Sequence, residues 1–196
     1  MKKRKPHQKK LYEKVESGEY ELYFEDECHF KLTLTIIRAW FLSGTIPTIK
    51  SPVDRFKMSV FGAMGMNGQL IISQSDKFNA ETFKQFLEKL VEKAVVGKTK
   101  NGNKKKILLV LDNAKYHHAI LLQPFIESMS DVIELFFLPP YSPDMNAIEM
   151  CWKKTRRAVT HNRFFESLDN LKYDLTMYWN NFLFPNNELK QLTAYI

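Results

Sequence analysis

The chain has 196 residues, a length typical of one domain with its own hydrophobic core. Its 44% hydrophobic and 13% aromatic content excludes general disorder. It contains no apolar run of about 18 residues and begins without the apolar segment of a signal peptide, so we expect no membrane span. Its two cysteines, Cys28 and Cys151, are too few for a disulfide framework or a four-ligand zinc site, and we expect reduced thiols in a cytoplasmic protein.

Positive charge is concentrated in two blocks of the chain, whose net charge is +7. The first ten residues carry six Lys or Arg and no acid, and residues 98–106 contain five lysines. Such blocks are usually flexible and solvated, and they suit a polyanion such as DNA. We therefore expect a basic N-terminal arm, residues 1–19, followed by one domain, residues 20–196.

Hydrophobic periodicity predicts the elements in chain order, after a short helical or linking segment at residues 11–18. Alternation in residues 20–30 places Leu22, Phe24, Asp26 and Cys28 on one face of a strand. The predicted strands are residues 20–30, 55–64, 69–73, 107–111 and 132–138, with 30–40 also β-prone and 42–54 rich in turns. The predicted helices are a segment capped by Asn79 that runs to about 95, residues 117–130, a run ending near 160, and residues 167–182.

The order of these elements predicts an α/β fold. Gly-Met-Asn-Gly at residues 65–68 joins two of the strands into a hairpin. Hairpin strands followed by strand–helix–strand crossovers indicate a mixed five-stranded sheet with helices on both faces.

The stretch 138–152, LPPYSPDMNAIEMCW, is the one around which the rest of the chain is organised. Its prolines and its Ser-Pro-Asp tripeptide predict a rigid turn that can be neither a helix nor a central strand. A helix-competent run follows directly and carries a single acid, Glu149, about one turn from its start. We infer that the turn aims this carboxylate at a fixed place.

Three acids stand out by position: Asp26 within the first strand, Asp112 at the end of a buried strand, and Glu149 near the start of a helix. A charged residue in an apolar strand is costly to bury unless it is paired or bound to a cation. A small set of oxygen ligands suits Mg²⁺, and two such ions can serve phosphodiester cleavage. Simpler roles stay open: Asp112 could cap a helix, Glu149 could complement a helix dipole, and Asp26 could belong to an edge-strand cluster with its acidic neighbours.

Four segments together resemble the catalytic domain of DDE transposases, in the mariner-like superfamily and most closely the bacterial insertion-sequence 630 family. They are YFEDECHF around Asp26, IIRAWFLSGTIPTI, LVLDNAKYHHA around Asp112, and LPPYSPDMNAIEMCW around Glu149. The 36 residues between Asp112 and Glu149 also fit the spacing in that family, and the resemblance covers residues 20–181. Ala147 departs from the proline that the family usually has after the asparagine, and we expect a slight loss of rigidity with unchanged chemistry.

The resemblance implies an RNase H-like fold in which residues 20–196 are the DDE catalytic domain. Asp26 and Asp112 would lie on adjacent central strands, and Glu149 would reach them from a helix, so that the three hold two Mg²⁺ or Mn²⁺ ions and carry catalysis. The implied reaction is cleavage of DNA at the transposon's terminal inverted repeats, followed by attack of the freed 3′-hydroxyl on target DNA. The implied assembly is a homodimer on DNA in the bacterial cytoplasm.

Four neighbours of the acids are candidates for binding DNA. Asn113 and His117 match the family's DNxxxH pattern and are expected to orient a phosphate, a water or the preceding acid, with a helix cap and a surface histidine as the alternatives. Lys153 and Arg156 follow Glu149 by four and seven residues and share its helix face, where they would hold DNA phosphates unless they only form a solvated basic face.

Three further residues receive structural roles. Glu27 should point to the opposite strand face from Asp26, so we do not expect it to be a metal ligand. Asp144 is expected to cap the helix that carries Glu149. Trp40 is expected to take part in ordinary hairpin packing, with a DNA-facing wedge as the alternative.

Transposases of this kind carry a paired helix-turn-helix region before the catalytic domain, and residues 1–19 leave no space for one. We therefore expect a separately encoded or frameshift-joined N-terminal part to recognise the transposon ends, because a basic arm alone does not read bases. Two hypotheses remain open. One is a DDE transposase acting on DNA, which the intact acid triad favours. The other is a non-catalytic DNA-binding or assembly subunit, or an inactive remnant.

Overall fold

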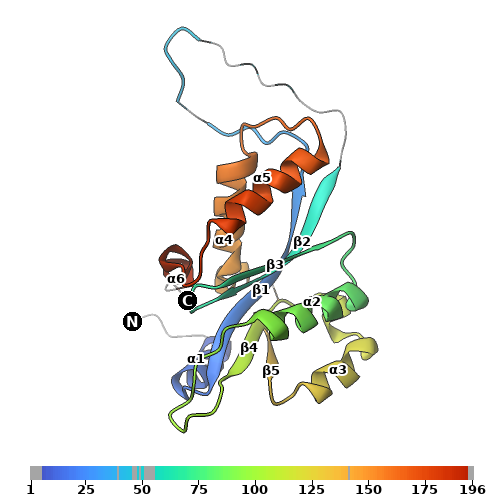
Figure 1. The fold of residues 1–196 in the computed structure, drawn as a ribbon, viewed down its shortest axis with the longest axis vertical. Coiled ribbons are helices and arrows are strands. Elements are labelled where there is room, and N and C mark those ends of the chain that lie inside the picture. Colours follow the sequence, from blue (N-terminus) through green and yellow to red (C-terminus); the bar gives the residue numbers. More distant parts are fainter. Residues whose placement is uncertain are drawn as a thin grey trace.

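The protein is built on one mixed sheet, seen in a computed structural model that describes residues 6–38, 40–45, 48, 50, 56–140 and 142–193. Those residues form five strands in the order β3-β2-β1-β4-β5 (Figure 1). The strands are β1 (Tyr20–Lys31), β2 (Lys57–Gly65), β3 (Leu70–Ser75), β4 (Lys106–Leu111) and β5 (Ile133–Phe137). The first three strands pair antiparallel, whereas β1, β4 and β5 run parallel, so the predicted mixed five-stranded sheet is confirmed.

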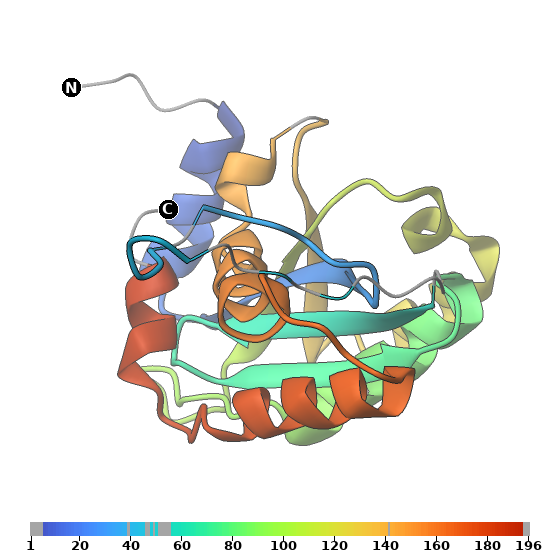
Figure 2. The ribbon, with the colours of Figure 1, turned by 90° about the horizontal axis from the view of Figure 1, so that it is seen from above.

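Helices contribute to a separate hydrophobic core on each face of the sheet, as predicted. One core contains side chains of α1 (Pro6–Glu16), α4 (Ile148–Thr155), α5 (Leu168–Asn180) and α6 (Asn187–Thr193). The other contains side chains of α2 (Ala80–Lys93), α3 (Gln123–Ser128) and two 3₁₀ turns, Lys115–His118 and Ile120–Leu122. Figure 2 shows α5 running alongside β2 and β3. Alternation along β1 puts Leu22, Phe24 and Cys28 in the first core and Tyr23 in the second.

Local signals in the sequence explain the best-predicted elements. Asn79 caps α2 by accepting a hydrogen bond from the backbone N–H of Thr82, whose side chain bonds back to Asn79, as in a capping box. Gly68 has a φ of +87° in the turn between β2 and β3, a conformation that glycine adopts without strain.

The predicted helix 117–130 is wrong over most of its length. The chain instead forms the two 3₁₀ turns and then only the six-residue α3. Pro124 lies in the first turn of α3, where its missing N–H is tolerated, but it cannot continue a helix that began upstream. The strand prediction 132–138 is confirmed as β5, although β5 is only partly buried because it lies at the edge of the sheet.

Residues 30–40 do not form a second strand. β1 ends at Lys31. Beyond it, in the described part of this segment, Thr35 forms an isolated β-bridge with His161. Trp40 is fully exposed, so the expectation of hairpin packing is wrong. Several predicted features lie outside the described residues: residues 1–5 of the basic arm, Pro47, Pro52, Arg55 and Tyr141.

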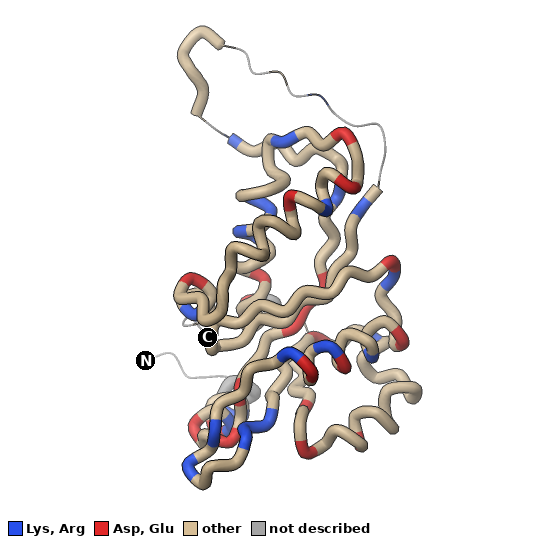
Figure 3. The backbone as a smooth tube through the Cα atoms, viewed as in Figure 1, with Lys and Arg blue, Asp and Glu red and all other residues tan. Residues whose placement is uncertain are grey.

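Part of the predicted basic arm is folded. Residues 6–16 form α1, and Leu11 of this helix is buried in the core against β1. Figure 3 shows acidic residues of β1 near the centre of the sheet. Across the described ranges, no helix has both the length and the apolar character needed to cross a bilayer.

Candidate active site

The parallel register of β1 and β4 brings two of the predicted acids together. Tyr20 pairs with Lys106, and the ladder continues to Phe24 and Val110. Asp26 and Asp112 each follow the last pair of this ladder by two residues, Asp26 within β1 and Asp112 directly after the end of β4. Since β1 lies between β2 and β4, the alternative of an edge-strand charge cluster around Asp26 is excluded.

The proline-rich turn delivers the third acid, and it is anchored at both ends. Leu138 donates its backbone N–H to the carbonyl of Leu111 at the end of β4, at 2.8 Å. At the other end the buried side chain of Asn146 donates from Nδ2 to the backbone carbonyl of Glu25 in β1, at 2.7 Å. α4 begins directly afterwards, and Glu149 lies in its first turn.

The structure corrects one expectation at the start of α4 and supports another. The helix begins after Ala147, without a side-chain cap, so Asp144 does not cap it. Ala147 has a φ of −61°, close to the value that a proline ring fixes. Ala147 therefore has the φ that the family's usual proline would impose at this position.

Asp26, Asp112 and Glu149 line a single cleft of about 500 Å³. Its other lining residues are Asn113, Ala114, Leu138, Pro139, Pro140, Ser142 and Asn146. Three carboxylates facing one solvent-connected cleft form an oxygen-only donor set, which suits Mg²⁺ or Mn²⁺. The residues present therefore fit the cations that the sequence implies.

The Asp26 carboxyl is held in an environment that disfavours its charged form. Burial is the main cause, and the nearby Glu149 carboxylate is the second; together they raise the pKa of Asp26 to about 8. Trp152 on α4 donates from Nε1 to Asp26 Oδ2 at 3.0 Å and fixes the orientation of this carboxyl. Like charges gathered in a poorly solvated place are what a bound cation relieves.

Gly62 makes room for that tryptophan. It pairs with Asp26 across the β1–β2 ladder, and a Cβ added at Gly62 would lie 2.4 Å from the Trp152 ring. The indole therefore occupies the space that a side chain at position 62 would fill.

We expect Asp26→Asn to stabilise the metal-free protein at pH 8. The folded-state pKa of Asp26, about 8, lies above the unfolded value of about 4, so its contribution to stability is fully present below pH ~4 and is lost as pH rises through about 8. The free energy of unfolding in EDTA, measured with urea, should fall over this range in the wild type and fall less in the variant. Asp112→Asn is the matched control: a hydrogen bond with His117 lowers the pKa of Asp112, so this variant should gain nothing at pH 8. Equal stability of Asp26→Asn and wild type at pH 8 would contradict the assignment.

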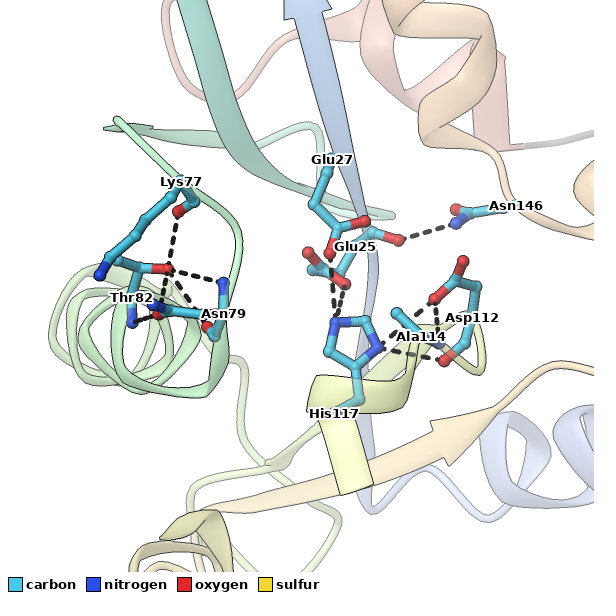
Figure 4. Close-up of polar contacts among 9 residues, drawn as sticks. All are labelled: Glu25, Glu27, Lys77, Asn79, Thr82, Asp112, Ala114, His117 and Asn146. Carbon is cyan, nitrogen blue, oxygen red and sulfur yellow. Dashed lines mark hydrogen bonds and ion pairs between the residues drawn. The ribbon is translucent and has the colours of Figure 1, made fainter. Parts of the chain in front are cut away.

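His117 is buried, and its ring lies between Asp112 and the carboxylates of Glu25 and Glu27 (Figure 4). Its Nδ1 lies 3.4 Å from Asp112 Oδ1, and its Nε2 lies 3.3 Å from Glu27 Oε1 and 3.9 Å from Glu25 Oε2. This place favours orientation of Asp112 over direct contact with DNA. As expected, Glu27 points away from Asp26.

The other three predicted DNA-binding residues differ in their exposure and in the contacts of their side chains. Asn113 lines the cleft and donates from Nδ2 to the backbone carbonyl of Leu138. Lys153 is exposed. Arg156 instead turns inward: its Nη2 lies 2.9 Å from Cys28 Sγ and its guanidinium stacks 5.7 Å from the Phe30 ring centroid.

Comparison of the sequence with known proteins identifies related chains. Residues 21–172 match a family model described as DDE superfamily endonuclease. An uncharacterised 39 kDa protein of insertion element IS630 from Shigella sonnei is 24% identical over 153 residues, which cover 78% of this chain and 42% of that protein. An uncharacterised protein of Sinorhizobium fredii, y4pE/y4sA, is 34% identical over 73 residues, which cover 37% of this chain and 50% of that protein.

Solved structures share the fold. The Mos1 mariner paired-end complex with Mn aligns with a TM-score of 0.66 at 15% identity, covering 95% of this chain and 56% of that one. The catalytic domain of Mos1 mariner transposase aligns with a TM-score of 0.54, and the alignment covers 95% of this chain and 86% of that one. The sheet is therefore of the RNase H-like type, as predicted, and the chain spans about half the length of the curated relatives that it matches.

Proposed function

Because the chain belongs to the DDE superfamily endonucleases, in the IS630/mariner transposase group, we propose that it cleaves DNA at transposon ends and joins the freed 3′-hydroxyl to target DNA. One observation carries the proposal. Asp26 of β1 and Asp112, directly after the adjacent parallel strand β4, line one cleft, and an anchored turn brings Glu149 to the same cleft.

In the proposed mechanism, Asp26, Asp112 and Glu149 would hold two Mg²⁺ or Mn²⁺ ions. Such ions would supply activation of an attacking oxygen and stabilisation of the charge on the leaving oxygen in an in-line displacement at phosphorus. The chain's own task is to hold its carboxylates in place. Trp152 fixes the Asp26 carboxyl, and His117 together with the backbone N–H of Ala114 fixes that of Asp112.

DNA is the proposed partner, as transposon terminal repeats and as target. Asn113 is exposed and lines the cleft, and Lys153 is exposed on α4 four residues after Glu149, so both are suited to contact phosphates. Arg156 supports the helix through Cys28 and Phe30, so we assign it to packing rather than to DNA. A homodimer, and recognition of the ends by a separately encoded or frameshift-joined helix-turn-helix part, complete the proposal. Within it, residues 20–196 are the catalytic domain and 1–19 the basic arm.

Cleavage of a supercoiled plasmid that carries the element's terminal repeats tests the function. We expect nicked and linear products with Mg²⁺ or Mn²⁺ and intact plasmid in EDTA, since the donor set needs a divalent ion to act. The chain should be assayed alone and with its upstream DNA-binding part. Retention of the DNA in a gel shift without cleavage under either ion would favour the alternative, a non-catalytic DNA-binding subunit or inactive remnant.

A further inference from the structure

A second group of metal-ligating side chains lies behind the cleft, on the other face of β1. Within the described ranges, the one group of three such residues with ligand atoms within 4.8 Å of one another is Glu25, Glu27 and His117. The three predicted catalytic acids do not converge as closely. The side chains of Glu25 and His117 are fully buried, and that of Glu27 is 12% exposed.

These side chains leave an unusual number of polar atoms unsatisfied. Both carboxylate oxygens of Glu25, Oε1 of Glu27 and Nε2 of His117 are buried and make no hydrogen bond, although His117 Nε2 and Glu27 Oε1 approach to 3.3 Å. An unpaired buried carboxylate costs several kcal/mol, and each such atom in a folded protein needs an explanation. A cation bound by one ligand atom from each residue would give each of the three side chains a partner.

The orientation of His117 is that of a metal ligand. Its Nδ1 lies 3.3 Å from the backbone carbonyl of Asp112 and 3.4 Å from Oδ1 of the same residue. An N–H at Nδ1 that faces these oxygens leaves the lone pair of Nε2 directed toward Glu25 and Glu27 (Figure 4). Metal-binding histidines commonly use their second ring nitrogen in this way, to bond a carbonyl or a carboxylate.

The distances also suit a cation. Ligand atoms about 2.1 Å from an ion, at tetrahedral or octahedral angles, lie roughly 3.0–3.4 Å apart. The approach of His117 Nε2 to Glu27 Oε1, 3.3 Å, is within this range, and Glu25 Oε2 at 3.9 Å needs only a small movement. The Phe83 ring, 4.3 Å from the imidazole, supplies an apolar wall.

We propose that Glu25, Glu27 and His117 bind one divalent transition-metal ion, of the Mn²⁺ or Zn²⁺ class, at a site distinct from the cleft. Two carboxylates neutralise the ion, and a nitrogen ligand favours such an ion over Mg²⁺. The bound ion fixes the imidazole, and through it the carboxylate of Asp112. The competing occupant is a proton, which would make His117 an imidazolium paired with the two glutamates.

Mn²⁺ electron spin-echo spectroscopy tests whether an ion occupies this site, because an imidazole ligand adds ¹⁴N modulation to the Mn²⁺ signal. The catalytic acids offer no nitrogen ligand, so the modulation also distinguishes this site from the cleft. The protein is Asp26→Asn/Glu149→Gln, which weakens the cleft and leaves the second site intact. We expect one bound Mn²⁺ with ¹⁴N modulation from a directly coordinated imidazole. His117→Gln in this background should abolish the modulation, whereas His118→Gln, which changes an exposed neighbour, should keep it.

Glu27→Gln provides a second test if His117→Gln does not fold. This variant keeps the imidazole but loses one charged ligand, and we expect Mn²⁺ affinity at the second site to fall by about 10–100-fold. Absence of ¹⁴N modulation in the parent variant at saturating Mn²⁺, or its persistence in folded His117→Gln, would overturn the proposal. Neither readout involves DNA cleavage, so failure here leaves the proposed function untouched.

Discussion

Replacing Asp26 or Asp112 by asparagine, or Glu149 by glutamine, should reduce metal-dependent DNA cleavage by roughly 10²–10³-fold or more, as loss of one group that stabilises developing charge typically does. An amide has nearly the shape of the carboxylate but no charge, so it holds a divalent cation poorly. The measurement is the initial rate of plasmid nicking at fixed Mn²⁺, with folding checked by circular dichroism.

Asp144→Asn is the matched control for these three variants. Asp144 is an exposed acid in the same turn that leads to α4, but it does not line the cleft. Its removal changes the local charge by the same amount and should leave the nicking rate within about twofold of wild type, as a surface change usually does. Undiminished cleavage in any one of the triad variants would remove that residue from the active site.

Trp152→Ala should destabilise the fold by about 3–5 kcal/mol, the usual cost of deleting a large buried aromatic side chain. The indole is 1% exposed, fills the space above Gly62 and meets the Phe30 ring edge-on at 6.1 Å between centroids. It also donates the hydrogen bond that orients Asp26. Urea denaturation monitored by far-UV circular dichroism measures the loss.

Two further tryptophan variants separate the packing role of Trp152 from its role in orienting the Asp26 carboxyl. Trp152→Phe keeps most of the apolar volume but lacks the Nε1 donor, so we expect a smaller loss of stability together with slower cleavage. Trp40→Ala removes a fully exposed indole and should change the free energy of unfolding by less than about 0.5 kcal/mol. A Trp152→Ala variant as stable as Trp40→Ala would show that the indole does not support the core.

The sequence predicted the site where its signals were local. Alternation along β1 put Asp26 on a definite face, the apolar run before Asp112 marked a strand end, and the turn before Glu149 was recognisable from its prolines. These patterns depend on residues that are close in the chain, and the structure brings the three acids to one cleft.

The residues that support the acids could not be predicted from the sequence, because their hydrogen-bond partners are far away along the chain. Asn146 bonds the backbone of Glu25 across 121 positions, and Trp152 reaches Asp26 across 126. Neither contact follows from periodicity, since an asparagine in a turn and a tryptophan in an amphipathic helix each have an ordinary local explanation. His117 was noticed through its motif, but its burial required the 3₁₀ turn that replaces the predicted helix.

The three acids are held in place by different kinds of structure. Asp26 lies in β1 and Asp112 directly after β4, so their spacing is maintained by the ladder between two adjacent parallel strands of the sheet. Glu149 is in the first turn of a helix that begins without a side-chain cap and whose lead-in turn is tied to β1 through Asn146. A displacement of that turn would move the Glu149 carboxylate relative to the other two, so the geometry of the three acids depends on the hydrogen bond between Asn146 and Glu25.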